Sequence, residues 1–128
     1  MSGSSISFVL NGSLQYPPDE GAPPVTVQFG ITAQGQSQEG GRMTLTGTGT
    51  KVIPFGTVGS PGAKGVLIEY LPQPGGVPVN VTFNGGTDAL EISPGGFLAI
   101  GNPAPTAGIT SLSIAYTADC QLRVQLLG

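Results

Sequence analysis

Glycine and proline interrupt this chain every few residues, and between the interruptions apolar and polar residues alternate with a period of two. The sequence has 22 Gly and 12 Pro, and helical spacing of apolar residues is almost absent. Alternation over short runs that end at Gly or Pro is typical of half-buried β-strands. In the clearest run, VTVQFGITA, Val25, Val27, Phe29, Ile31 and Ala33 share one face. The pattern predicts an all-β fold with essentially no helix.

Further runs of the same kind follow one another along the whole chain at roughly ten-residue spacing, the rhythm of a β-sandwich or barrel. They are SISFVL, VTVQFGITA, RMTLT, TKVIPF, GVLIEYL, PVNVTF, DALEIS, FLAI, ITSLSIAYT and CQLRVQLL. We expect one domain, residues 1–128, that forms an antiparallel β-sandwich or jelly-roll-like barrel of about 8–10 short strands. GVLIEYL is apolar on both faces apart from Glu69, so we expect a central strand or one covered by a neighbouring subunit.

The segment FNGGTDALEIS is predicted to be a hairpin by the parity of its apolar residues. Before the turn these are odd-numbered (Val77, Val79, Val81 and Phe83), and after it they are even-numbered (Leu90 and Ile92). A two-residue loop pairs odd with even positions, and Asn-Gly or Gly-Gly supplies the positive φ that such a loop needs. Leu90 is then expected to face the core opposite the valines, so that Leu90→Asp would abolish folding.

Two more connections can be assigned from their turn residues. Ser-Pro-Gly-Gly, with Pro94 and Gly95 in its central positions, suits a type II turn, which we expect at a corner between sheets. Leu112, Ile114 and Tyr116 share their parity with the apolar residues of the last strand, so we expect these strands to pair across Ala118 to Cys120 or across a bulge. The last strand is expected to be locked into a sheet.

Three loops stand out by composition. YPPDEGAPP (16–24), with four prolines and two acids, is expected to be stiff, extended and exposed. GNPAPTAG (101–108) is expected to be similar. GTVGSPGAKG (56–65) is expected to be flexible, and it lacks the spacing of a phosphate-binding loop.

Charged residues are few and scattered, and this distribution argues against several classes of partner. Charged residues make up 9% of the chain, against roughly 25% in typical soluble proteins. The net charge is −3, and the only cations, Arg42, Lys51, Lys64 and Arg123, are scattered. No basic stripe of the kind used for nucleic acids is present, and no apolar run is long enough to span a membrane. The first residues do not form a secretory signal, and a single cysteine, Cys120, fits synthesis in a reducing cytoplasm.

Catalytic chemistry has little support in these residues. The chain contains no histidine, the commonest general base and metal ligand. A Ser-Lys pair with Lys51 or Lys64 has no local signature. Cys120 has no clustered cations to lower its pKa, so we interpret it as a passive thiol. We expect no enzyme activity, no catalytic residues, no cofactor and no metal.

Carboxylates can support two kinds of chemistry, glycoside hydrolysis and calcium binding. They are Asp19, Glu20, Glu39, Glu69, Asp88, Glu91 and Asp119. Asp88 and Glu91 are expected on opposite strand faces, where they would converge poorly for paired-carboxylate chemistry. No spaced acidic loop supports a calcium site. Turn and surface roles are favoured for both.

The block VTFNGGTDALEISPGGFLAIGNP, followed by ITSLSIAYTADCQLRVQLLG, resembles small virion structural proteins of tailed bacteriophages. The resemblance covers roughly residues 51–128 and rests on strand rhythm, the NGG and SPGG turns and the terminal LLG. It implies a compact β-sandwich or jelly-roll module and a role carried by surfaces, so it assigns no site residue.

The resemblance leads to a main functional hypothesis, a capsid decoration (cement) protein that stabilises the shell where major capsid subunits meet. It would act in the virion after synthesis in the host cytoplasm. We expect a homo-oligomer, and threefold capsid sites suggest a trimer. One alternative is a neck, tail or fibre component of the virion. Another is a carbohydrate-binding adhesion module, for which Tyr16, Tyr70 and Tyr116 are the main stacking candidates.

Overall fold

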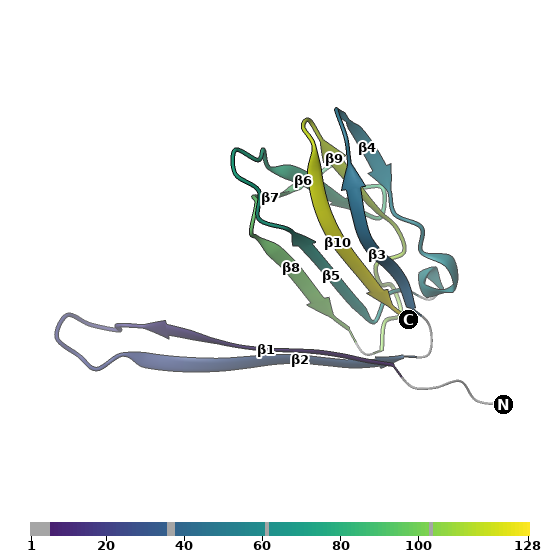
Figure 1. The fold of residues 1–128 in the computed structure, drawn as a ribbon. Coiled ribbons are helices and arrows are strands. Elements are labelled where there is room, and N and C mark those ends of the chain that lie inside the picture. The colour runs from purple at the N-terminus through teal and green to yellow at the C-terminus, as the bar shows by residue number, and fades with distance from the viewer. Residues whose placement is uncertain (1–5, 36–37, 61, 103) are drawn as a thin grey trace.

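The computed structural model describes residues 6–35, 38–60, 62–102 and 104–128 (Figure 1). They form ten β-strands and one short 3-10 helix, η1, and they contain no α-helix. The predicted all-β class is confirmed. The strands are β1 (Ile6–Tyr16), β2 (Val25–Gly35), β3 (Gln38–Leu45), β4 (Gly49–Val52), β5 (Gly65–Tyr70), β6 (Val79–Phe83), β7 (Leu90–Ile92), β8 (Phe97–Gly101), β9 (Leu112–Tyr116) and β10 (Cys120–Leu127), and η1 is Gly56–Gly59.

Eight of these strands form a sandwich of two four-stranded antiparallel sheets. The strand orders are β3-β10-β5-β8 in one sheet and β4-β9-β6-β7 in the other. Strand β3 pairs with β10, β4 with β9, β5 with β8, and β6 with β7, so the pairs are nested around the β6–β7 turn. Such a long hairpin rolled into two layers has the strand order of a jelly roll, one of the two predicted architectures.

The core lies between the two sheets and is built from the inward positions that alternation predicts. Val66, Ile68 and Tyr70 on β5 alternate with residues on the outer face, and Leu122, Val124 and Leu126 do the same on β10. Apolar surface removed from water stabilises the fold by about 25 cal/mol per Å². The buried apolar residues are Leu45, Ile53, Phe55, Val58, Ala63, Val66, Ile68, Tyr70, Val79, Val81, Ile92, Leu112, Ile114, Cys120, Leu122, Val124, Leu126 and Leu127.

The β6–β7 connection has the predicted Asn-Gly turn and the predicted parity, but six residues, 84–89, separate the two strands instead of the two that were predicted. Asn84 (φ 54°) and Gly85 (φ 66°) occupy its two central positions, and the Gly86 amide donates to the Phe83 carbonyl at 3.0 Å. Two consecutive positive φ values are those of a type I′ turn. The ladder pairs Val79 with Ile92, so odd positions do face even ones.

The expected inward set of this hairpin is only partly right. Val79, Val81 and Ile92 are buried, but Val77 is 42% exposed and Leu90 is 50% exposed. β7 is a three-residue strand at the edge of its sheet, and Leu90 is its first residue. The prediction that Leu90→Asp abolishes folding therefore rests on a wrong burial assignment.

The Ser-Pro-Gly-Gly turn is a corner, as predicted. The Gly96 amide donates to the Ser93 carbonyl at 2.8 Å, and Gly95 has φ 84°. Positive φ at the third position, after proline, is the type II geometry. The turn carries the chain from β7 in one sheet to β8 in the other.

The predicted C-terminal hairpin is wrong. Strand β9 pairs with β4 and β6, whereas β10 pairs with β3 and β5 in the other sheet. Residues with the same parity face the core because the two strands lie on opposite sides of it. The last strand is nevertheless locked into a sheet, and β5, the run with two apolar faces, is central.

The loops differ from their predictions in how they are anchored. Tyr16–Pro24 is largely exposed, as expected. The 101–108 loop is mostly exposed but buries Pro105, and Pro103 lies outside the described residues. The 56–65 stretch was expected to be flexible, yet it includes η1 and packs Val58 and Ala63 into the core. Pro61 also lies outside the description.

Strands β1 and β2 form a separate two-stranded sheet that projects from the sandwich as a long arm (Figure 1). Cross-strand pairing runs from Ile6 opposite Gly35 to Tyr16 opposite Val25, with residues 17–24 as the tip. The alternation in VTVQFGITA correctly predicted a strand with an apolar face. The sequence predicts one sandwich for residues 1–128 and no projecting arm, yet Val25, Val27 and Phe29 on this face are 36–49% exposed.

Candidate functional site

Charged and metal-binding side chains do not gather into a site. Among the described residues, no group of three or more His, Cys, Asp or Glu side chains could hold a metal ion. Asp88 and Glu91 are both exposed, in a loop and on β7. One ion pair occurs in the described ranges, between Arg123 Nη1 and Glu69 Oε2 at 3.5 Å. Both partners are partly exposed, so the pair contributes little to stability.

Cys120 is the first residue of β10 and is only 1% exposed. Burial, with a smaller effect of the Asp119 carboxylate, raises the pKa of its thiol. A buried, protonated thiol is a poor nucleophile. The geometry agrees with the interpretation of Cys120 as a passive core residue.

The three tyrosines do not form a common stacking platform. Tyr16 is on the arm, Tyr70 is on β5 and Tyr116 is on β9, so each belongs to a different sheet. Tyr70 is buried, and its hydroxyl donates to the Val77 carbonyl at 2.8 Å. Tyr16 is 41% exposed, and Tyr116 is half-buried.

The arm has two faces of opposite character. Residues directly opposite in an antiparallel pair share a face, and neighbours along a strand alternate between faces. The register therefore groups the following residues on what we call the apolar face: Ile6, Leu10, Gly12, Leu14, Tyr16, Val25, Val27 and Phe29. The other face carries Ser7, Val9, Asn11, Ser13, Gln15, Thr26, Gln28, Gly30, Thr32 and Gln34.

Charge is absent from both strands of the arm and present at its tip. Neither 6–16 nor 25–35 contains Lys, Arg, Asp or Glu, whereas Asp19 and Glu20 lie in the tip. The arm can be recognised in the sequence, because two uncharged alternating runs of similar length flank a proline-rich turn. One sandwich was predicted for all of residues 1–128, and the arm was therefore missed.

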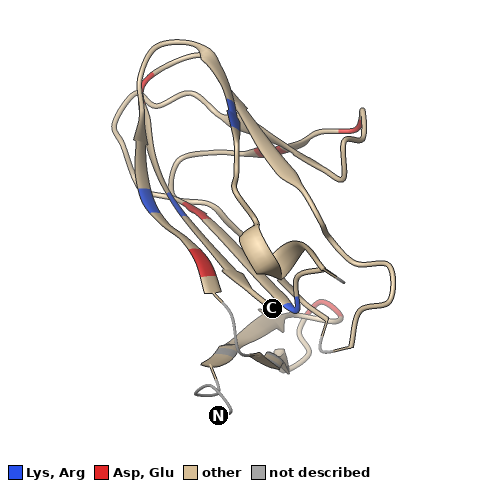
Figure 2. Cartoon of the chain, turned by 90° about the vertical axis from the view of Figure 1, so that its right-hand side faces the viewer, with Lys and Arg blue, Asp and Glu red and all other residues tan. Residues whose placement is uncertain are grey.

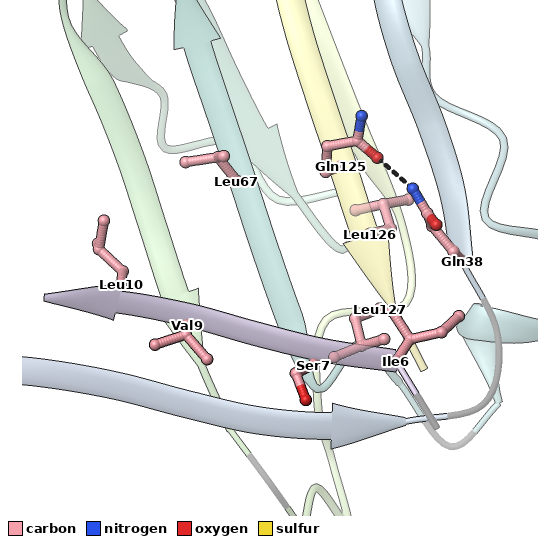
Figure 3. Close-up of a pocket in the computed structure, with 9 residues that line it drawn as sticks. All are labelled: Ile6, Ser7, Val9, Leu10, Gln38, Leu67, Gln125, Leu126 and Leu127. Carbon is pink, nitrogen blue, oxygen red and sulfur yellow. Dashed lines mark hydrogen bonds between the residues drawn. The ribbon is translucent and has the colours of Figure 1, made fainter. Parts of the chain in front are cut away.

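The base of the arm packs against the sandwich. Ile6 and Leu10 on β1 line a cavity of about 350 Å³ together with Leu67, Leu126 and Leu127 (Figure 3). At the same end, a Cβ on Gly35 would overlap the Gly128 carbonyl. The arm thus lies over the outer side of β5 at Leu67, the face for which a neighbouring subunit was one predicted cover.

The outer half of the apolar face has no cover in the described structure. Leu14 is 58% exposed, Phe29 49% and Val27 44%, and Tyr16 and Val25 beside the tip are also exposed. The Phe29 ring lies over Gly12, its cross-strand partner, where a Cβ would collide with it. Contiguous exposed apolar surface on a domain marks an interaction site.

No helix in the described ranges is both long and apolar enough to cross a membrane. Comparison with protein-family models, curated proteins and solved structures finds no match to this chain.

Proposed function

We propose that this protein is a non-enzymatic structural subunit of a bacteriophage virion, a decoration or cement protein that stabilises the capsid shell where major capsid subunits meet. The observation that carries the proposal is the arm, which presents an uncharged apolar face outside the sandwich. An isolated two-stranded sheet is at best marginally stable in water. Burial of this face against other subunits would stabilise both the arm and the assembly.

Several features of the sandwich suit such a role. Its core forms without a disulfide, and its last strand, β10, lies between two neighbours. Jelly-roll sandwiches occur in capsid proteins, lectins and cupins, so the fold alone does not decide between them. Cupin-type metal chemistry is disfavoured because the chain has no histidine. Carbohydrate binding is disfavoured because the tyrosines lie in three separate sheets.

Electron microscopy of purified particles tests the proposed location, and heating of particles stripped of the protein tests the role. A ligand that binds the assembled shell stabilises it by mass action. Stripped particles are expected to release DNA at a lower temperature, with intact tails and unchanged adsorption, and added protein is expected to restore heat resistance. Asp88→Asn with Glu91→Gln is the control variant and is expected to restore it equally.

The opposite result identifies the alternatives. Stripped particles that keep full heat resistance but fail to adsorb to the host would contradict the cement role. Density for the protein in the neck, tail or fibre would then assign it to that part of the virion.

A further inference from the structure

The outer half of the arm's apolar face needs a partner, and the charges near it limit what that partner is. The strands of the arm carry no cation, and the tip carries Asp19 and Glu20. Anionic lipids and nucleic acids attract Lys and Arg and repel such a tip. A protein surface with apolar side chains next to cations is the complementary partner.

The chain itself offers such a surface on the side opposite the tip of the arm. The arm extends beyond β8, whereas β3 and β4 are the edge strands at the other side of the sandwich (Figure 1). A shallow groove of about 300 Å³ runs between these edges, lined by residues 39–43 with Lys51 and Pro54. Figure 2 views this side and shows both basic and acidic segments on it.

The groove combines two free cations with apolar side chains. Lys51 and Arg42 are exposed, and neither belongs to the ion pair found in the described ranges. Arg42 donates to the Gln121 side chain at 2.7 Å, which leaves its charge unneutralised. Pro54 in the groove is exposed, and Met43, which also lines it, is half-buried.

One acid also lines the groove. The Glu39 carboxylate lies against the backbone of Gly56, where a Cβ would be 2.5 Å from its Oε1. The charged groups of the groove are therefore Arg42, Lys51 and Glu39, with a net charge of +1. The tip of the arm carries −2 from Asp19 and Glu20.

We propose that the apolar face of the arm binds the β3–β4 side of a second copy of this chain, with Asp19 and Glu20 next to that copy's Arg42 and Lys51. The proposal rests on the proposed role as an assembly subunit and names the partner of the arm. The two surfaces are different, so the contact is heterologous and joins copies head to tail, and a ring forms where the rotation between copies closes. A trimer is the smallest ring that matches a threefold capsid site.

The main rival is an isologous dimer in which two arms pack with their apolar faces together. That dimer would bury the same side chains, but it would leave Asp19 and Glu20 without a cation and the β3–β4 groove empty. Complementary charge favours the head-to-tail contact, because opposite charges across an interface fix register and suppress wrong partners.

The first test compares two adjacent cross-strand pairs of the arm in the full-length protein. Leu14→Thr with Val27→Thr places a Thr–Thr pair on the apolar face, whereas Ser13→Thr with Gln28→Thr places the same pair on the polar face. Sedimentation velocity at low salt is expected to show at least a tenfold loss of self-association for the first variant. The second is expected to change it less than twofold.

Charge reversal provides a test that does not depend on the arm's apolar packing. Asp19→Lys with Glu20→Lys is expected to weaken self-association at least tenfold at low salt, and Arg42→Glu with Lys51→Glu is expected to do the same. The chain with all four substitutions is expected to recover to within threefold of the original. Circular dichroism and thermal melts establish that each variant is folded.

Each outcome decides the proposal. Self-association that is lost in both reversed variants and restored in the combined one supports it. A protein that stays monomeric at several hundred micromolar, or self-associates equally in all charge variants, overturns it. If the head-to-tail contact is overturned but the unmodified protein still binds the shell, the proposed function is retained. If the unmodified protein does not bind the shell either, both proposals are wrong.

Discussion

At the residue scale, neighbouring positions on one short strand differ sharply in what they tolerate. Ile92 is 7% exposed and faces Val79, whereas Leu90, two residues earlier on the same side of β7, is 50% exposed. Parity identifies the face of a residue but not whether the opposite sheet reaches far enough to cover it. Burial, and with it sensitivity to charge, therefore differs along one face of this short edge strand.

The contrast predicts opposite outcomes for one substitution at the two sites. Ile92→Asp buries an unpaired carboxylate and is expected to destabilise the protein by more than about 4 kcal/mol or to prevent folding. Leu90→Asp is expected to cost about 1 kcal/mol, mainly through poorer strand propensity. Urea denaturation measures both, and a folded Ile92→Asp protein with near-normal stability would contradict the assigned core.

The buried thiol of Cys120 makes the free energy of unfolding depend on alkaline pH. Burial raises its pKa in the folded chain above the ordinary value of 9.0, which the unfolded chain retains. The folded state then binds more protons, so stability is full below pH 9 and falls as pH rises through the folded pKa. Burial also raises the pKa of Tyr70 above its ordinary 10.0, which extends the fall.

Urea titrations at pH 7, 9 and 10.5 are expected to show this decline. Cys120→Ala is expected to lower stability at every pH but to make the decline shallower from pH 9 upward, because the thiol no longer ionises on unfolding. Stability that rises between pH 8 and pH 10 would rule out the raised pKa.

At the element scale, a single asparagine connects two loops that are distant in sequence. The Asn84 Oδ1 accepts from the backbone amide of Thr110 at 2.8 Å and of Ser111 at 3.3 Å, and its Nδ2 donates to the Gly108 carbonyl at 3.2 Å. Asn84 also holds φ 54° in the β6–β7 turn. One residue thus shapes the turn and fixes the end of the 101–111 loop.

Two substitutions separate these contributions. Asn84→Gly keeps the positive φ but loses the side-chain hydrogen bonds, with an expected loss of about 1–2 kcal/mol. Asn84→Ala loses the same bonds and adds the strain of a left-handed backbone, about 1 kcal/mol more. Urea denaturation measures the difference. Equal stability of the two variants would show that the turn relaxes to another geometry.

Local pattern determined what the elements are, but not which elements pair. The Asn84 turn, the Ser93–Gly96 corner and the apolar faces of β5 and β10 follow from neighbouring residues and could be predicted. Pairing of β9 with β4 instead of β10 depends on the nested jelly-roll wrapping, which involves contacts far apart in sequence. The arm escaped prediction because an alternating strand has the same pattern whether a core or a partner covers its apolar face.

At the scale of the whole molecule, the proposed contact makes the arm of one copy the donor and the β3–β4 groove of the next copy the receptor. The proposed contact requires both apolar burial and placement of the charged tip. A second explanation, in which the arm is a non-specific apolar patch, requires only area. Arm length separates the two explanations, because a longer arm has more apolar surface but carries its tip past the groove.

Duplicating the rungs Ser13–Leu14 and Val27–Gln28 lengthens the arm by about 7 Å and keeps every residue on its original face, since two residues are added to each strand. If the tip must reach Arg42 and Lys51, self-association is expected to fall at least tenfold and to lose its salt dependence. A non-specific patch would instead bind more tightly.

Adding one residue to each strand is the control: it turns Tyr16 and Val25 to the polar face, so both explanations predict weaker association. Sedimentation velocity across a salt series distinguishes these outcomes, and tighter, salt-insensitive association of the lengthened arm would refute the head-to-tail contact.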